Sequence, residues 1–494
     1  MRNKIYIFFV ILLMTACASN QVADVPTATE PVFVELPVTD TPAIPTETPL
    51  PTATVVPALE RAIYTLDVLM DYNAKTVSVN QKILYPNLTG NQLNNLVIAI
   101  VPNLWQGSFN LTSISINGEA ITNYSITNQR LDIPLSFFLA PNETIEIDIQ
   151  YSLALPFAEQ EDPSISRPRI YGYTSRQINL TNWYPFVAPN TNGEWILHEP
   201  WYYGEHLVYD AADYEVRLTF ADPASAPIVA SSGFPETQAD GSITYKINSA
   251  RTFALSASRD FQTSTTQLGD VTLTSYYFPF NERGGQAALQ ATVEAMQVFS
   301  QRFGTYPHKS LAIVMGDFND GMEYSAFYYL SKDFYNLYDG TPANYLTFVA
   351  VHETAHQWWF EQVASDQALQ PWVDEALATY SERIYYESVH PDLVSWWWLY
   401  RIDFYKPEGF VDIPIYEGQG FRPYTNATYF QGAKFLENTR LRIGDEAFFT
   451  FIQDYLNQGR GKIITANDFF RILRSHTSTD ISDLINQYFR SVYQ

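Results

Sequence analysis

The sequence predicts a multidomain protein with an N-terminal antiparallel β-sandwich-like domain, followed by an α+β domain whose second half is mostly helical. Two observations predict this fold class. From Arg61 to about Phe261, apolar and polar residues alternate in short runs separated by turn residues, as in half-buried strands. From Gly284 onward the apolar residues follow the period of amphipathic helices. We expect the β-domain to span residues 59–262 and the second domain residues 263–494.

The first 17 residues predict an export signal of the lipoprotein type. Arg2 and Lys4 give a positive start, and Ile5–Leu13 is an apolar core too short to span a bilayer as a mature helix. The segment ends in L-M-T-A-C, which is similar to a bacterial lipobox with Met14 in place of the usual Leu. Cys17, the single cysteine of the chain, supplies a thiol for acylation. We expect an exported, extracytoplasmic protein that is lipid-anchored to the bacterial cell membrane; an ordinary cleaved signal peptide is the alternative.

Residues 18–58 predict a disordered linker. The stretch contains eight prolines and many Thr and Ala, but no Lys or Arg, so it cannot pack a core. Proline-rich chains favour an extended form with a reach of about 3 Å per residue. The linker therefore predicts a stalk that holds the folded part away from a membrane surface.

The β-domain has its clearest alternating runs at residues 64–72, 76–85, 96–101 and 144–151. It is also rich in aromatic residues, namely Trp183, Tyr184, Trp195, Trp201, Tyr202 and Tyr203. These aromatics allow a carbohydrate-binding interpretation. We favour the alternative, in which they serve the core and a domain interface, because aromatic side chains bury large areas there.

The helical half begins with a stripe of apolar residues, Leu289, Val293, Met296 and Phe299, which predicts a helix stopped by Gly304 and Pro307. A short buried strand, Leu311–Met315, follows. Further helical segments continue to the end of the chain.

The motif H-E-x-x-H occurs as His352, Glu353 and His356. Residues four apart lie on the same face of a helix, so the two imidazoles aim at one point with Glu353 beside it. Apolar residues on both sides, including Trp358 to Phe360, predict that this helix is buried. A zinc ion suits such a buried imidazole pair, with the glutamate as general base. A chance match on a core helix is the alternative.

A third metal ligand is predicted at Glu375. Catalytic zinc takes three protein ligands and keeps one open position. Glu375 follows His356 after eighteen residues, in a segment that also has a helical pattern, so a short loop can bring it to His352 and His356. We expect one zinc ion per chain. Asp374 either orients a ligand imidazole or caps this second helix.

These residues resemble the gluzincin aminopeptidases, the family of aminopeptidase N and the leukotriene hydrolase. Two further motifs carry the resemblance: D-G-M-E-Y at residues 320–324, where the family has G-[AG]-M-E-N, and Y-F-Q-G-A at residues 429–433, where it has Y-x-K-G-A. The resemblance spans roughly Tyr64 to the C-terminus and implies a thermolysin-like catalytic domain. We expect the large C-terminal helical domain of many relatives to be absent and the site to be more open.

The resemblance implies the catalytic roles. Glu353 accepts the proton of the attacking water and delivers it to the leaving amine, and Tyr429 donates to the developing oxyanion. Tyr424 is close in sequence, but the following Gly432 favours Tyr429. Gln431 stands where relatives have Lys.

The same resemblance implies that Glu323 binds the free α-amine of a peptide substrate, with Gly321 and Met322 in the same substrate-binding stretch. An ammonium group in a desolvated cleft requires a carboxylate partner. Tyr324 replaces the Asn of the family motif and Asp320 replaces its first Gly, so the acid is kept while its neighbours differ.

The chain carries 29 basic and 53 acidic residues, a formal net charge of −24, and no basic stripe interleaved with aromatics. This pattern predicts no nucleic-acid partner. The sequence predicts a zinc aminopeptidase acting on peptides with a free N-terminus. The alternatives are a zinc endopeptidase or epoxide hydrolase on the same frame, and a surface binding protein with a vestigial peptidase. The sequence does not predict an oligomeric state.

Overall fold

A computed structural model describes residues 59–158, 170–319 and 321–493. These residues belong to one compact unit. The predicted signal peptide with Cys17, the predicted linker at 18–58 and Asp320 lie outside the described residues.

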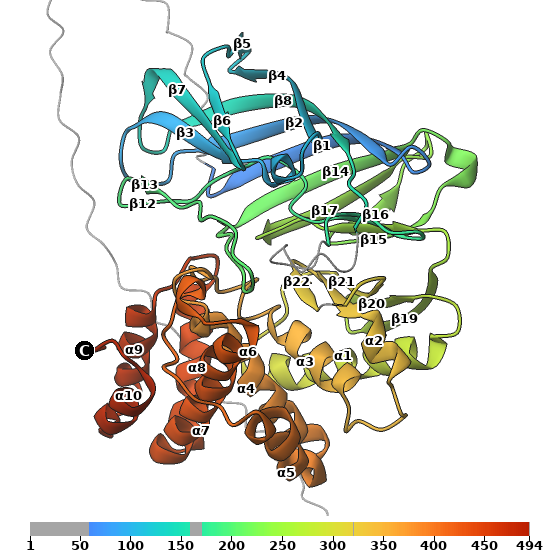
Figure 1. The fold of residues 1–494 in the computed structure, drawn as a ribbon. Helices are drawn as coiled ribbons and strands as arrows, with labels where there is room; N and C mark the ends of the chain where they lie inside the picture. Colours follow the sequence, from blue (N-terminus) through green and yellow to red (C-terminus); the bar gives the residue numbers. More distant parts are fainter. Residues whose placement is uncertain (1–58, 159–169, 320, 494) are drawn as a thin grey trace, which may run out of the picture. The chain divides into compact units, whose positions relative to one another are not determined.

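The largest sheet of the N-terminal region has eight strands (Figure 1). They are β1 (Ala62–Asp71), β2 (Thr76–Pro86), β4 (Phe109–Ile116), β5 (Glu119–Ala120), β8 (Thr144–Ala154), β14 (Ala212–Phe220), β16 (Phe234–Thr237) and β17 (Ile243–Ala250). Their order is β16-β17-β14-β1-β2-β8-β4-β5, and all neighbours are antiparallel except β1 and β14. This parallel pair differs from the expected antiparallel sheet. It forms because a long connection containing other strands lies between the two.

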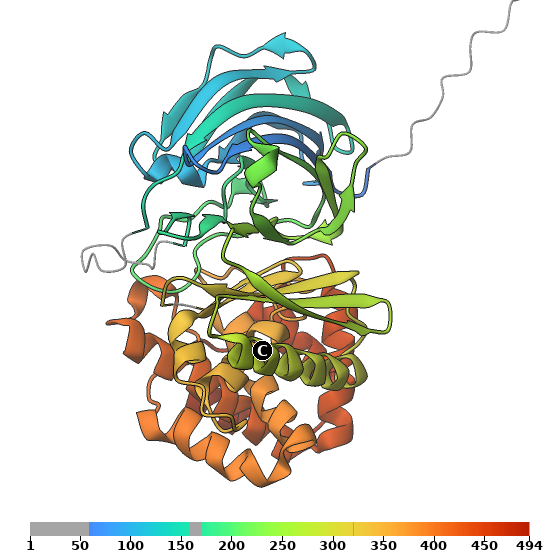
Figure 2. The same ribbon diagram turned by 90° about the vertical axis from the view of Figure 1, so that its right-hand side faces the viewer.

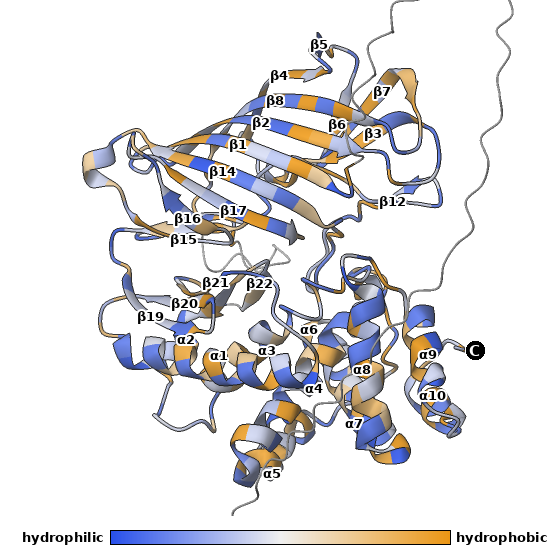
Figure 3. Cartoon of the chain, turned by 180° about the vertical axis from the view of Figure 1, so that it is seen from behind, coloured by the Kyte–Doolittle hydropathy of each residue, from blue (hydrophilic) through white to orange (hydrophobic). Residues whose placement is uncertain are grey.

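The apolar and polar residues that alternate in the sequence correspond to buried and exposed side chains in this sheet. Along most of β2 each exposed residue is followed by a buried one, and Figure 3 shows hydrophilic and hydrophobic residues alternating along its strands. Successive side chains of a strand point to opposite faces, so one face of the sheet packs on the core.

Two four-stranded sheets and a two-stranded sheet complete the N-terminal region. The first consists of β3 (Leu93–Ala99), β6 (Ser125–Thr127), β7 (Arg130–Leu139) and β11 (Phe186–Val187). The second consists of β9 (Gly172–Tyr173), β10 (Ile178–Leu180), β15 (Ile228–Ser231) and β18 (Leu255–Ser258). The two-stranded sheet pairs β12 (Asn190–Thr191) with β13 (Glu194–Trp195), and the helical turns among these strands are η1 (Val101–Leu104) and η2 (Pro223–Ser225).

The aromatic residues of this region divide between core and surface. Trp183 and Tyr184 are buried in the β-domain core, and the indole nitrogen of Trp183 donates to the carbonyl of Phe253 at 3.0 Å. Tyr202 is 60% exposed, whereas Tyr203 beside it is buried. Two of the six aromatics therefore build the core, as we favoured.

The second region starts with a five-stranded sheet in the order β19-β20-β21-β23-β22. Its strands are β19 (Gln262–Leu268), β20 (Val271–Tyr277), β21 (Ser310–Gly316), β22 (Met322–Tyr324) and β23 (Phe327–Ser331). The longest helix, α1 (Glu282–Arg302), packs along this sheet, as Figure 2 shows. Leu289, Met296 and Phe299 of the predicted stripe are buried.

Helices form the remainder of the chain. They are α2 (Lys332–Asn336), α3 (Tyr345–Ala355), α4 (Trp372–Val389), α5 (Val394–Trp397), α6 (Phe421–Thr425), α7 (Gly432–Ile443), α8 (Asp445–Gly459), α9 (Ala466–Ser475) and α10 (Ser482–Tyr488). Shorter helical turns are η3 (Pro391–Leu393), η4 (Trp398–Ile402), η5 (Asp403–Tyr405), η6 (Ile415–Glu417) and η7 (Asn426–Gln431). Within the described part of the chain, none of the helices combines the length and apolarity needed to cross a membrane.

Candidate metal centre and its cavity

Helix α3 carries the first predicted metal ligand, His352, and ends at the second, His356. Asn344 caps its N-terminus by accepting from the backbone N–H of Thr347 at 3.1 Å. The helix ends at Ala355, and His356 is its C-cap residue in a helical conformation. The predicted spacing of the two imidazoles is therefore kept. The buried run after His356 lies in turns, so the helix is shorter than the apolar pattern predicted.

The first turn of α4 brings Glu375 to this pair. The Nε2 atoms of His352 and His356 lie 3.1 Å apart, and Oε2 of Glu375 lies 3.3 Å from the first and 3.6 Å from the second. Glu375 Oε2 is buried and makes no hydrogen bond with the described residues. Tetrahedral zinc with ligands at 2.0–2.1 Å separates them by about 3.3 Å. The three donor atoms fit such an ion.

A buried carboxylate contacts the Nδ1 atom of each imidazole, on the side of the ring away from Nε2. His352 Nδ1 lies 3.0 Å from Glu382 Oε1, and His356 Nδ1 lies 2.8 Å from Asp374 Oδ1. No side chain caps α4, so of the two interpretations of Asp374 the structure favours orientation of an imidazole. Such partners fix the tautomer that leaves Nε2 free to ligate a metal.

Glu382 is a site residue that the sequence interpretation missed. Arg401 donates to it through two nitrogens at 2.8 and 2.9 Å, and Trp397 Nε1 donates at 2.9 Å. Burial raises the pKa of Glu382, but Arg401 and His352 outweigh it and hold the pKa below its usual value. Its signal in the sequence is its spacing, because it lies two helical turns after Glu375 on α4.

The electrostatics favour a cation between these groups. Burial lowers the pKa of His352 to about 4, so this imidazole is neutral. Burial also opposes protonation of His356, but the carboxylates of Asp374, Glu323 and Glu375 raise its pKa well above the usual range. The excess negative charge at this point is what a divalent cation neutralises.

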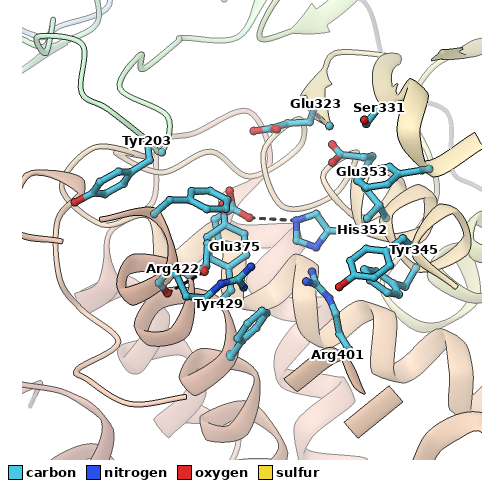
Figure 4. A pocket seen from close by; sticks show the side chains of 18 of the residues that line it. Tyr203, Glu323, Ser331, Tyr345, His352, Glu353, Glu375, Arg401, Arg422 and Tyr429 are labelled. Atoms are coloured by element: carbon cyan, nitrogen blue, oxygen red, sulfur yellow. Dashed lines mark hydrogen bonds and ion pairs between the residues drawn. The ribbon is translucent and has the colours of Figure 1, made fainter. Parts of the chain in front are cut away.

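Glu353 faces the same cavity from α3 (Figure 4). It is 5% exposed. A Cβ atom on Gly321 would lie 2.6 Å from Glu353 Oε1. Gly321 therefore lines the cavity as predicted, and the absence of a side chain there lets the backbone pass close to the carboxylate.

Glu323 lies in the middle of β22, where it pairs with Tyr328 of β23. Its carboxylate lines the cavity, is 4% exposed and accepts from Gln367 Nε2 at 3.2 Å. Burial, with His356 opposing and Glu205 adding to it, raises the pKa of Glu323 to about 8. The Met322 side chain packs against the hydrophobic core and is not part of the described cavity lining.

Tyr429 and Tyr424 occupy different surroundings. Tyr429 lies in the π-helical turn η7 and lines the cavity, with its ring stacked on His352 at 5.9 Å between centroids. π-helical turns are frequent at functional sites. Tyr424 is buried in a small apolar cluster with Tyr203 and Ile415. The structure thus brings Tyr429, and not Tyr424, into the cavity wall.

The N-terminal region also contributes to the cavity wall, through Tyr202, Tyr203, Gly204 and Glu205. Gly204 has a φ of +71°, and a Cβ there would lie 2.5 Å from Ile415 Cγ2, so the loop requires glycine at this position. The Tyr203 hydroxyl donates to the carbonyl of Gly418. In the sequence, Tyr202 and Tyr203 stood out only as aromatic residues of the β-domain, and no pattern indicated Gly204 or Glu205.

The cavity has a volume of about 550 Å³. Besides the residues above, Arg401 and Arg422 line it, and the guanidinium of Arg422 lies 4.0 Å from the centre of the Tyr405 ring. The cavity thus joins the three candidate metal ligands with three further glutamates, Glu205, Glu323 and Glu353, and with Tyr429. Its volume is of the size that small ligands occupy.

Comparisons with known proteins agree with this arrangement. Residues 287–488 match the model of the peptidase family M1 domain. This match confirms the resemblance inferred from the motifs. The chain is 21% identical over 233 residues to Aminopeptidase 2 of Candida albicans, covering 44% of this chain and 25% of that protein. It is 23% identical over 233 residues to the mitochondrial Aminopeptidase 2 of Saccharomyces cerevisiae, with 44% and 24% covered. The chain therefore spans about a quarter of the length of these curated relatives.

Solved structures resemble the fold over most of the chain. A mutant of an M1 zinc metallopeptidase from Deinococcus radiodurans, bound to a Tyr-Ser-Ala substrate, matches with a TM-score of 0.62 and 18% identity, covering 88% of this chain and 95% of that one. The same metallopeptidase without the mutation matches with a TM-score of 0.60 and 18% identity, covering 87% and 93%. These likenesses confirm the predicted fold class, a β-rich N-terminal region followed by a largely helical one.

Proposed function

Because residues 287–488 form a peptidase family M1 domain, we propose that this protein is a zinc-dependent aminopeptidase that removes N-terminal residues from peptides. Zinc is the cofactor that the family indicates, and His352, His356 and Glu375 would hold it. A bound zinc ion supplies Lewis acidity, which makes a water molecule more acidic and a carbonyl carbon more electrophilic.

Glu353 and Tyr429 provide the proton transfers and hydrogen bonds of the proposed reaction. Glu353 accepts a proton from the attacking water and then donates it to the leaving amine. Burial, together with the charge of Glu375, raises the pKa of Tyr429 well above its ordinary value. The phenol therefore stays protonated and can donate to the developing oxyanion.

The observation that carries the aminopeptidase proposal is the buried carboxylate of Glu323 in the same cavity as the metal-binding side chains. A buried carboxylate is costly unless a cation or donors satisfy it. The α-ammonium group of a peptide is such a cation, and Glu205, which lines the same cavity, adds a second negative charge. A substrate whose ammonium binds here presents its first peptide bond to the metal.

The replacement of the family's Asn by Tyr324 leaves this arrangement intact. Tyr324 is 3% exposed and its ring packs against Phe327 and Tyr329, at 6.1 and 6.2 Å between centroids. Its side chain is not part of the described cavity lining. For this reason we place the aminopeptidase ahead of the endopeptidase and epoxide hydrolase alternatives.

The test compares aminoacyl fluorogenic amides with their N-acetylated forms, using the native protein and Glu323→Gln. Acetylation removes the ammonium charge, so native kcat/KM should fall by about 10- to 100-fold, the usual effect of losing a hydrogen bond to a charged group. Glu323→Gln should lose activity on free amines and discriminate much less. The two losses should not multiply, because both remove the same contact. Equal cleavage of both substrates by the native protein would instead indicate an endopeptidase.

We further propose that the protein is exported and lipid-anchored at Cys17. The proposal rests on the single thiol of the chain, placed directly after an apolar signal core. Metabolic labelling with a tagged fatty acid tests it: the native protein should be labelled and Cys17→Ser should not. Label on the serine variant would refute the anchor.

A further inference from the structure

The turn that follows Glu323 is held by one side chain from the metal-binding segment. Gln357 Nε2 donates to the carbonyl of Tyr324 at 3.0 Å, and Gln357 Oε1 accepts from the backbone N–H of Ala326 at 2.9 Å. Gln357 is fully buried and directly follows His356 in the chain. Its side-chain amide thus makes two hydrogen bonds, one as donor and one as acceptor, with the backbone of the turn.

This turn needs external support. β22 has only three residues, and Ala326 adopts a φ of +51°, which is unfavourable for a side chain with a Cβ atom. A hairpin this short is not stable by itself. The position of Glu323 therefore depends on the contacts that surround the turn.

A second contact comes from the end of the same segment. The Ser325 hydroxyl donates to Glu361 Oε2, and the other carboxylate oxygen lies 2.5 Å from His308 Nε2. The backbone N–H of Glu361 donates in turn to the carbonyl of His356 at 2.9 Å. Glu361 is 1% exposed, so this connection runs through the protein interior.

A third contact, from the side-chain amide of Gln367, orients the side chain of Glu323. Gln367 Nε2 donates both to Glu323 Oε1 at 3.2 Å and to Asp374 Oδ2 at 2.9 Å. Asp374 supports His356 through its other oxygen. The backbone of the turn after Glu323 is therefore tied to Gln357, next to His356, and the side chain of Glu323 is tied to the group that supports His356.

We infer that Gln357 is a positioning residue that fixes the distance between the Glu323 carboxylate and the metal centre, and thereby fixes cleavage at the first peptide bond. The inference rests on the proposed function. Gln357 and His356 are adjacent in the chain. The turn that carries Glu323 therefore cannot move relative to His356 without breaking the two hydrogen bonds that the Gln357 side chain makes with it. A peptide whose ammonium group binds Glu323 then always places its first peptide bond at the metal centre.

The experiment compares Gln357→Met with the matched control Gln362→Met. Gln362 is also a buried glutamine of this segment, but its Nε2 donates to the backbone carbonyl of Gln357, and among the described residues it makes no hydrogen bond with the turn. Both variants remove a buried amide of the same size. Thermal unfolding and zinc content would be measured for each, so that a general loss of stability is seen separately.

The readouts are the kcat/KM ratio of free to N-acetylated substrates and the products of a pentapeptide by mass spectrometry. For Gln357→Met we expect this ratio to fall about tenfold, the size of two lost hydrogen bonds, through a higher KM for free amines. Dipeptides should appear among its products, and its zinc content should match that of the native protein. Gln362→Met should keep the native ratio and release single residues.

Two outcomes separate the inference from the proposed function. If the native protein does not distinguish free from acetylated substrates, the proposed function fails whatever the variants do. If the native protein distinguishes them and Gln357→Met keeps the same ratio and register while losing rate, Gln357 has only a structural role. Should Gln357→Met fail to fold, Gln357→Glu keeps the acceptor for Ala326 and, when ionised, replaces the donor to Tyr324 by a charged oxygen that the carbonyl repels. An unchanged ratio in that variant would overturn the inference.

Discussion

The metal side and the amine side of the cavity are assembled in different ways. His352, His356 and Glu375 come from one helix, its cap and the first turn of the next helix. Glu323 comes from a short strand, and Glu205 faces the same cavity from a loop of the N-terminal region. The metal side is set by helical spacing, whereas the amine side depends on hydrogen bonds between segments far apart in the sequence.

This difference predicts two kinds of mutational effect. A change on the metal side should slow the hydrolysis of every substrate by the same factor, since all substrates use the same proton transfers and the same ion. A change on the amine side should alter the preference for a free N-terminus and leave the metal in place. Each variant below is therefore measured with a free and an N-acetylated substrate.

The largest effect is expected for Glu353→Gln. The change keeps the shape of the side chain and removes the proton acceptor, so kcat should fall by roughly 10²–10⁴-fold. Zinc content, measured by atomic absorption, should stay at one ion per chain. Because the loss is common to all substrates, the factor should be the same for free and acetylated amides. Turnover near the native rate would exclude Glu353 as the base.

A loss of about 10²–10³-fold in kcat is expected for Tyr429→Phe, as for removal of other oxyanion donors. Tyr424→Phe is the matched control, since it removes the same hydroxyl from a ring outside the described cavity lining. It should stay within a few-fold of the native rate. The reverse result would assign the donor role to Tyr424.

Glu382→Gln should weaken zinc binding by about 10–100-fold, the usual effect of removing such a supporting carboxylate. The amide oxygen can still accept from His352, but the charge that pairs with Arg401 is lost. Glu387→Gln is the control, because Glu387 also lies on α4 but pairs with Arg440 at 2.7 Å. Competition with a chelator measures both affinities. A changed preference for free N-termini in Glu382→Gln would break the proposed separation of the two sides.

The smallest effect, about tenfold, is expected for Glu205→Gln, which removes one of the two charges facing the ammonium group. The loss should appear in KM for free amines and not for acetylated ones, with zinc content unchanged. Glu199→Gln, an exposed glutamate of the same segment, should match the native protein. An equal loss on both substrates would remove Glu205 from the amine site.

The sequence was sufficient where function follows from spacing along one helix or strand. Periodicity and spacing predicted the two regions of the fold and the approach of His352, His356 and Glu375. The resemblance to the gluzincin aminopeptidases, and not spacing, predicted that Glu323 and Tyr429 lie at the cavity. It placed Met322 with the substrate-binding residues, although its side chain packs against the core. Alternation along a strand explains this, since neighbours of an inward-facing glutamate must point away.

The sequence was insufficient where distant segments meet. Glu205 precedes the zinc motif by more than a hundred residues, and Gln357 contacts a turn that only the tertiary structure brings near it. The apolar pattern also predicted a longer helix α3 than the structure has. The buried aromatic residues after His356 lie in turns, and their apolar composition is the same as that of a buried helix. Composition cannot distinguish these two cases.

The loop Tyr202–Glu205 has a consequence for how such proteins can change during evolution. It lies outside the matched residues 287–488, yet it lines the same cavity as the candidate metal ligands. A recombination event that joined this peptidase segment to a foreign N-terminal partner would inherit the ion-binding residues and lose part of the substrate wall. A chimera that keeps residues 202–205 together with residues 287–488 would retain this part of the cavity lining.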